Sequence, residues 1–201
     1  MKKLVITLVL VVVFAAACAS PPAENTLATS PPTVEVQPTD GSPTPAEEIA
    51  LMELTSPEFN EGGMIPDKFG CKGEEVSPTL NWTEPPAGTQ SFALIMDDPN
   101  APMGTWVHWV LYNIPADTRS LPENVPGDPT LADGSMQGEN SWPRTGYGGP
   151  CPPVRTHNYF FKLYALDIMF TADPGLTKAE LLNLMEGHIL EEIHLTGRYS
   201  P

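Results

Sequence analysis

Five short apolar stretches, separated by clusters of proline, glycine and asparagine, predict β-strands. They cover residues 49–56, 79–82, 91–97, 105–114 and 158–167. The last of them carries apolar side chains on both of its alternating faces, including Tyr159 and Phe161 on one face and Phe160 and Tyr164 on the other. Because a strand with two apolar faces needs cover on both sides, this stretch is expected to be central in a packed sheet.

One helix is predicted near the end of the chain. Thr177 and Glu180 have the spacing of a capping box, and an apolar stripe follows at Leu181, Leu182, Met185, His188, Ile189 and Ile193. Gly187 is a position at which this helix could bend or divide, and residues 194–200 could form a last short strand. Strands first and one late helix favour an all-β-dominated β-sandwich with a C-terminal helix, although periodicity leaves a barrel open.

The first residues have the layout of an export signal. Lys2 and Lys3 precede an uncharged apolar run, Leu4 to Ala17, and small residues lead to Cys18. Small residues directly before a cysteine resemble a lipoprotein signal, so we expect cleavage after residue 17 and lipidation of Cys18. Ala15 stands where such signals usually have leucine. An uncleaved anchor and ordinary secretion are the alternatives.

Residues 18–48 differ in amino-acid composition from the rest of the chain. Proline, serine, threonine and alanine dominate residues 19–46, and no aromatic residue occurs there. Such a segment cannot bury enough apolar surface to offset its ordering entropy, so we expect a disordered tether. The predicted organisation is therefore a signal peptide at 1–17, a lipidated tether at 18–48 and one globular domain at 49–201, held on the outer side of a cell membrane.

The formal net charge is −15. This charge argues against nucleic acid as a partner, and against an anionic bilayer surface bound by charge alone. Any anion that the protein binds must be held by local donors against the field of the whole molecule.

Polar and titratable groups gather in three places within the apolar pattern. A strand ends in Asp97 and Asp98 before a proline-rich turn, His108 lies inside an apolar strand, and a loop rich in glycine and proline leads to His157 and Tyr159. A carboxylate near two imidazoles would raise their pKa values and let them donate to a phosphate or another small anion. Each residue also has a structural interpretation, as a core histidine, a turn former or a strand cap.

The remaining candidates carry less information. His188, on the helix stripe, is interpreted as structural, and His194 is left unassigned. Arg155 is either solvated or helps to attract an anion. Cys71 and Cys151 are either a disulfide, which an exported domain permits, or two reduced and buried residues.

Three motifs in this order, "DDPNAP", "GTWVHWVLYNIP" and "GYGGPCPPVRTHNYFFKLYALD", closely resemble the phosphatidylethanolamine-binding protein family. The nearest match is its prokaryotic, Raf-kinase-inhibitor-like branch, and the likeness runs from about Leu54 to Tyr199. It implies a two-sheet antiparallel β-sandwich with a shallow anion pocket and places Cys71 and Cys151 near one end, close enough to bond. By motif position the ligand-binding residues are Asp98, His108, His157 and Tyr159, with a wall of Pro102, Trp106, Pro152 and Pro153.

Two features depart from the family pattern. Asn100 replaces a second acid in the "DPDAP" motif, which removes a negative charge near the pocket. The loop after Pro153 is short, with Val154, Arg155 and Thr156 where a glycine is common. Both changes bear on the rim of the pocket rather than on the fold.

The resemblance implies a non-catalytic module that binds a phosphate, a phospholipid headgroup or a phosphorylated partner, and that could inhibit an extracellular enzyme. No cofactor is expected. The alternative is a small hydrolase that uses Asp98, His108 and His157 as acid–base groups. Against it, the sequence has no G-x-S-x-G elbow and places no serine beside these histidines. A metal site is a weaker alternative, because the spacing of the histidines and cysteines matches no zinc pattern.

Overall fold

The computed structural model describes residues 51–201. Within them the order is β1 (Leu54–Thr55), β2 (Gly63–Met64), a 3-10 turn η1 (Asp67–Phe69), β3 (Leu80–Trp82), β4 (Ser91–Asp98), β5 (Trp106–Pro115), β6 (Ser120–Leu121), β7 (Met136–Gln137), β8 (His157–Leu166), α1 (Lys178–Met185) and β9 (Ile189–Tyr199). The predicted signal, the lipidation of Cys18 and the tether lie outside the described residues. No helix in 51–201 combines the length and apolarity that a membrane crossing requires.

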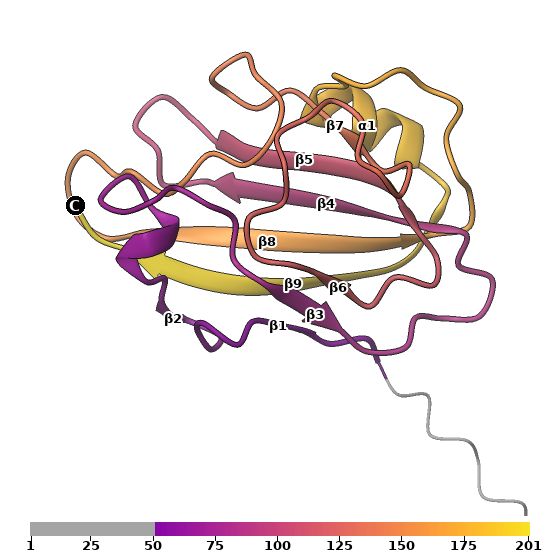
Figure 1. The fold of residues 1–201 in the computed structure, drawn as a ribbon, viewed down its shortest axis with the longest axis horizontal. Coiled ribbons are helices and arrows are strands. Elements are labelled where there is room, and N and C mark those ends of the chain that lie inside the picture. The colour runs from indigo at the N-terminus through magenta and orange to yellow at the C-terminus, as the bar shows by residue number, and fades with distance from the viewer. Residues whose placement is uncertain (1–50) are drawn as a thin grey trace, which may run out of the picture. The chain divides into compact units, whose positions relative to one another are not determined.

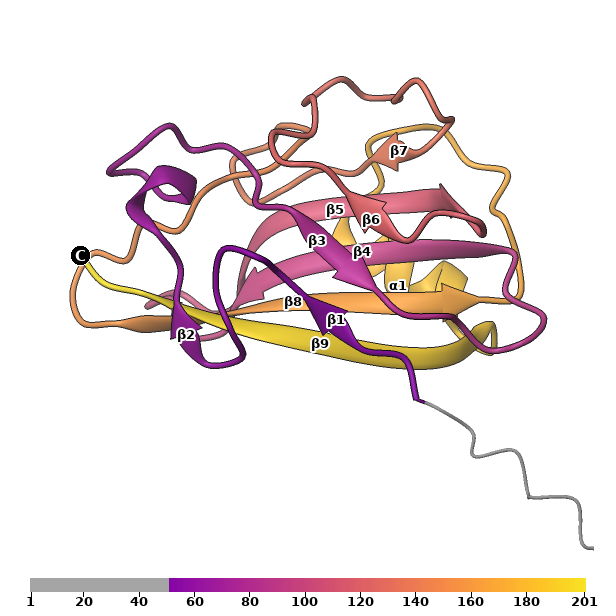
Figure 2. The same cartoon turned by 60° about the horizontal axis from the view of Figure 1, so that its bottom comes forward.

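The strands form two separate sheets. The large sheet has the order β2-β9-β8-β4-β5-β7 and the small one β1-β3-β6. The pairings are antiparallel except for β2 with β9, which is parallel. The four long strands lie side by side in Figure 1, and Figure 2 shows the small sheet lying across one face of them. The chain is therefore a sandwich, not a closed barrel.

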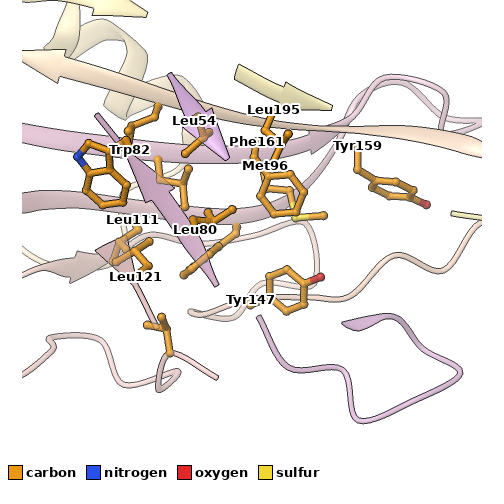
Figure 3. Packing of buried hydrophobic residues seen from close by; sticks show 14 of the residues in the cluster. Leu54, Leu80, Trp82, Met96, Leu111, Leu121, Tyr147, Tyr159, Phe161 and Leu195 are labelled. Atoms are coloured by element: carbon orange, nitrogen blue, oxygen red, sulfur yellow. The ribbon is translucent and has the colours of Figure 1, made fainter. Parts of the chain in front are cut away.

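The main core fills the space between the two sheets. Leu80 and Trp82 of the small sheet contribute to it, as do Met96 and Phe161 of the large one, and all four are buried. Figure 3 shows these side chains converging from both layers. Burial of large apolar side chains is worth roughly 1.5–3 kcal/mol each, so this interior holds the small sheet in place although its strands are only two or three residues long.

A second core covers the opposite face of the large sheet. Ile95, Val110 and Tyr164 pack there against Leu181 and Met185 of α1. β4 is buried on both faces, and so is β8 from Leu163 to Leu166. This accounts for the apolar side chains on both faces of residues 158–167, because β8 lies between β4 and β9, as predicted.

The predicted helix is correct at its start and wrong at its end. The Thr177 side chain accepts from the Glu180 amide and the Glu180 carboxylate accepts from the Thr177 amide, so the capping box is present. The helix ends at Met185, and Ile189 and Ile193 belong to β9 instead of the helix stripe. Gly187 has a φ of 81°, which is a left-handed conformation that divides the two elements.

Candidate functional site: an anion pocket at one end of the large sheet

Three neighbouring strands bring the sequence-predicted polar residues together. Asp98 ends β4, His157 begins β8, and His108 lies two residues after Trp106, the residue paired with Asp98. Tyr159 shares a face of β8 with His157 because side chains alternate along a strand. Asp98, His108, His157 and Tyr159 all line one cavity of about 450 Å³.

Asp98 and His157 form a buried pair. The His157 Nδ1 lies 2.7 Å from the Asp98 Oδ2, and the side chains are 1% and 4% exposed respectively. The other carboxylate oxygen accepts the backbone N–H of Asn100 at 2.8 Å. Because Nδ1 carries the proton shared with the carboxylate, Nε2 of His157 is left for a ligand.

His108 is held by the backbone rather than by a carboxylate. Its Nδ1 donates to the carbonyl oxygen of Gly148 at 2.7 Å, which again leaves Nε2 unoccupied. Burial lowers the pKa of His108, and this effect outweighs the opposing effects of the Gly148 carbonyl and of Asp98. The expectation that a nearby carboxylate would raise the pKa is therefore wrong for His108, because desolvation of the charged imidazolium is the larger effect.

Tyr159 is a buried donor without a partner. Its hydroxyl has no hydrogen-bond partner within residues 51–201, and Figure 3 shows its ring directed away from the aliphatic cluster. Burial, followed by the charge of Asp98, raises the pKa of Tyr159 far above its usual value, so the hydroxyl keeps its proton. A buried polar group is costly when unpaired, and a ligand oxygen in the cavity would satisfy this one.

The cavity walls are apolar. They include the four predicted residues Pro102, Trp106, Pro152 and Pro153, together with Ala101, Met103, Trp142 and Cys151, which sequence reasoning did not assign to the pocket. The Trp142 ring lies edge-on to both Trp106 and His108, with centroids 5.3 and 5.1 Å apart. Trp142 lies in a loop outside the three motifs, so its only sequence signal is a tryptophan among proline and glycine.

The substitution at Asn100 leaves the turn intact. Its side-chain oxygen accepts the backbone N–H of Asn158 at 2.8 Å and so ties the turn to the start of β8. A carboxylate oxygen could accept the same bond, and the amide does so without adding a charge. In the short loop Val154, Arg155 and Thr156 are exposed, and none of them lines the cavity.

A disulfide joins Cys71 to Cys151, with their Cα atoms 5.4 Å apart and a sequence separation of 80. It is reinforced by a hydrogen bond from the Cys71 N–H to the carbonyl of Pro150. Because Cys151 lines the cavity, the bond fixes one wall of the pocket to the segment after η1.

The other histidines lie elsewhere. His188 pairs with Asp167 at 2.8 Å, outside the pocket, in keeping with its structural interpretation. His194 is exposed and lines a different cavity. Within residues 51–201 no group of three or more His, Cys, Asp or Glu side chains is arranged to hold a metal ion.

The comparisons with known proteins agree with this architecture. The family model described as phosphatidylethanolamine-binding protein matches residues 55–200, and the chain belongs to this family. A UPF0098 protein of Methanothermobacter thermautotrophicus is 49% identical over 148 residues, which are 74% of this chain and 98% of that protein. A UPF0098 protein of Aquifex aeolicus is 45% identical over 153 residues, 75% and 89% of the two chains.

Two crystal structures share the fold. One is a putative phosphatidylethanolamine-binding protein homologue, CT736, from Chlamydia trachomatis, with a TM-score of 0.70 and 36% identity, covering 75% of this chain and 98% of that one. The other is E. coli YbcL, described as a new member of the mammalian family, with a TM-score of 0.68 and 32% identity over 76% and 99% of the two chains. The two-sheet fold and the YbcL-like prokaryotic branch are thereby established.

Proposed function

We propose that this protein is a lipid-anchored, extracytoplasmic binding protein whose pocket holds an oxyanion, such as the phosphate of a phospholipid headgroup. The observation that carries the proposal is the polar floor of the cavity. Two imidazoles have their Nδ1 atoms engaged by Asp98 and Gly148, and the buried Tyr159 hydroxyl has no hydrogen-bond partner within residues 51–201. These three side chains offer a ligand two Nε2 atoms and one O–H.

Anion binding at this floor requires a proton. With both imidazoles neutral, Asp98 gives the cavity a negative charge and each Nε2 is an acceptor. Protonation of His157 neutralises Asp98 and turns its Nε2 into a charge-assisted donor. His108, whose pKa is lowered by burial, stays an acceptor and suits a protonated oxygen such as P–O–H.

The apolar walls favour a ligand with more than a bare phosphate. Pro102, Trp106, Pro152 and Pro153 surround the polar floor, and Met103 and Trp142 extend the apolar surface to the rim, where they are 94% and 37% exposed. Proline fixes the backbone of these walls, so little ordering is needed on binding. A headgroup with an attached apolar portion fits this lining better than a free ion.

A binding role is favoured over the hydrolase alternative by the chemistry of the lining. Among residues 51–201 no serine or threonine lines the cavity, and the sulfur of Cys151 is engaged in the disulfide. A covalent mechanism by serine, threonine or cysteine has no nucleophile there. We infer that any effect on another protein, such as inhibition of an extracellular enzyme, follows from binding alone.

The decisive experiment is calorimetric titration with phosphoethanolamine and with inorganic phosphate at pH 6. His157→Ala removes one charged hydrogen bond, worth about 1.5–3 kcal/mol, and affinity should fall at least about tenfold. His188→Ala is the matched control, because it removes an imidazole paired with a carboxylate outside the pocket. Equal affinity of the wild type and His157→Ala would return the histidines to a structural role.

The anchoring part of the proposal has its own test. Cys18→Ser should move the protein from the membrane to the soluble fraction, because the thiol that would carry the lipid is gone. If the variant stays with the membrane and keeps its full N-terminus, the first residues are an uncleaved anchor instead.

A further inference from the structure

The end of β4 presents two consecutive carboxylates to opposite faces of the large sheet. Asp98 faces the pocket described above. Asp97 faces the α1 side and lines a separate cavity of about 370 Å³, together with Pro99, Thr105, Phe160, Lys162, Lys178 and His194. The pocket residues have no part in this second cavity.

Two lysines share the single carboxylate of Asp97. Lys162 of β8 donates to Oδ2 at 3.2 Å, and Lys178, the first residue of α1, donates to the same oxygen. The Asp97 side chain is 2% exposed, whereas those of Lys162 and Lys178 are 28% and 23% exposed. The buried acid therefore positions two ammonium groups at the edge of the cavity and neutralises only one of them.

The two ammonium groups keep unused hydrogen-bonding capacity. Each has three N–H donors, and within residues 51–201 Asp97 is the only side chain with which either forms an ion pair. Two donors on each lysine thus remain for solvent or a ligand. The formal net charge of the chain is −15. The two lysines nevertheless set the local potential at this cavity, because the more distant surface charges are screened by salt.

The rest of the lining is compatible with an organic anion. Lys162 and His194 face each other across the β8–β9 pairing, and the ring of Phe160 lies beside both, with its centroid 5.9 Å from the Lys162 Nζ and 6.1 Å from the His194 ring. Glu139 lines a neighbouring cavity that shares Lys178 and Thr105, yet forms no ion pair with the lysine.

We propose that this cavity is a second anion site, in which Lys162 and Lys178 bind the carboxylate or phosphate group of a small molecule. The ammonium pair supplies the charge, and Phe160 supplies an apolar surface for the remainder of the ligand. The site lies on the opposite face of the sheet from the pocket and does not depend on the proposed function of that pocket.

The test is an NMR titration of the purified, nitrogen-15-labelled protein with inorganic phosphate and, separately, with acetate. Saturable shifts are expected at the amides of Lys162, Ala179 and His194, which report the second site. Shifts at His108 and Gly148 report the pocket, so failure at one site is distinguishable from failure at the other.

Two variants change the charge of the cluster in opposite directions. Lys162→Gln leaves Asp97 paired with Lys178 and should weaken binding at the second site about three- to tenfold. Asp97→Asn removes the competing carboxylate and should tighten it. Lys162→Arg keeps the charge and should retain binding. It serves as the second probe if the Gln variant proves unstable.

Lys68→Gln is the control, because it makes the same change of charge at a surface lysine paired with Glu123. Shifts at Lys162 and Ala179 that do not saturate, or that are the same in the Lys162→Gln protein, would overturn the proposal. The lysines would then serve only to fasten α1 to the sheet.

Discussion

The Asp98 Oδ2 lies 2.7 Å from the His157 Nδ1, with both side chains almost fully buried. One oxygen of the carboxylate is hydrogen-bonded to this imidazole, and the other accepts the backbone N–H of Asn100. Both oxygens of the acid are therefore engaged within the protein, and its effect on a ligand passes through the imidazole. The charge of this carboxylate is thus compensated by donors within the protein before any anion binds.

Replacement of Asp98 tests this relationship. Asp98→Asn keeps an oxygen that can accept from Nδ1 but removes the negative charge of the pair, so the bond to His157 is no longer charge-assisted. Phosphate affinity at pH 6 should fall about tenfold, and calorimetry at this pH checks the effect. Asp167→Asn, which alters the equivalent pair with His188 outside the pocket, should behave as wild type.

Substitution of Tyr159 distinguishes an effect on ligand affinity from an effect on stability. Tyr159→Phe removes a hydroxyl that has no partner in residues 51–201, so the free energy of unfolding should stay the same or rise by up to about 1 kcal/mol. Phosphate affinity should nevertheless fall, by about three- to tenfold. Urea unfolding and calorimetry on the same samples give the two quantities.

Tyr147 provides the reciprocal control. Its hydroxyl donates to the Phe69 carbonyl at 2.8 Å inside the core, and Figure 3 shows it near the aliphatic cluster. Tyr147→Phe should cost about 1 kcal/mol of stability and leave affinity unchanged. If Tyr159→Phe destabilises the protein as Tyr147→Phe does, its hydroxyl has a structural partner.

The buried imidazole of His108 should make the free energy of unfolding depend on pH. Burial lowers its pKa in the folded protein, whereas the unfolded chain has the ordinary value of about 6.5. The unfolded state then binds the proton more readily, so this contribution to stability is complete above pH 6.5 and is lost as the pH falls below it. Unfolding free energies of the wild type and His108→Gln at pH 7.5 and 5.5 should show a smaller acid loss in the variant. An equal loss would mean that His108 takes up no proton on unfolding.

The disulfide should support both the fold and the pocket. Closing a loop of 80 residues corresponds to roughly 4 kcal/mol in the chain-entropy account. The double variant Cys71→Ser/Cys151→Ser should therefore unfold at a lower temperature and bind phosphate more weakly, because Cys151 lines the cavity. Intact mass with and without reductant establishes the bond in the purified protein. Wild type treated with reductant should match the variant, and a melting temperature that reductant leaves unchanged would contradict the prediction.

The long strands β4, β5 and β8 and the start of the helix could be predicted because their signals are local. Alternation in β8 and the Thr177–Glu180 box depend on residues close in sequence. The helix end could not, since Ile189 and Ile193 fit a helical stripe as well as a strand, and pairing of β9 with β8 decided between them. The short strands β2, β6 and β7 have too few residues for a periodic signal.

The features of the site also divide into those that the sequence predicted and those that only the structure shows. By its motifs, the sequence determined which family the chain resembles and which residues are candidates: Asp98, His108, His157 and Tyr159. It did not determine that His108 would be bound to Gly148 and have a lowered pKa, that Trp142 would complete the wall, or that Asp97 would gather two lysines on the opposite face. In these cases the residues that come into contact are 34 to 81 positions apart in sequence. The charge state and the donors of each group were therefore decided by the packing of the two sheets and the helix, because the solvation of a titratable group depends on what surrounds it in space.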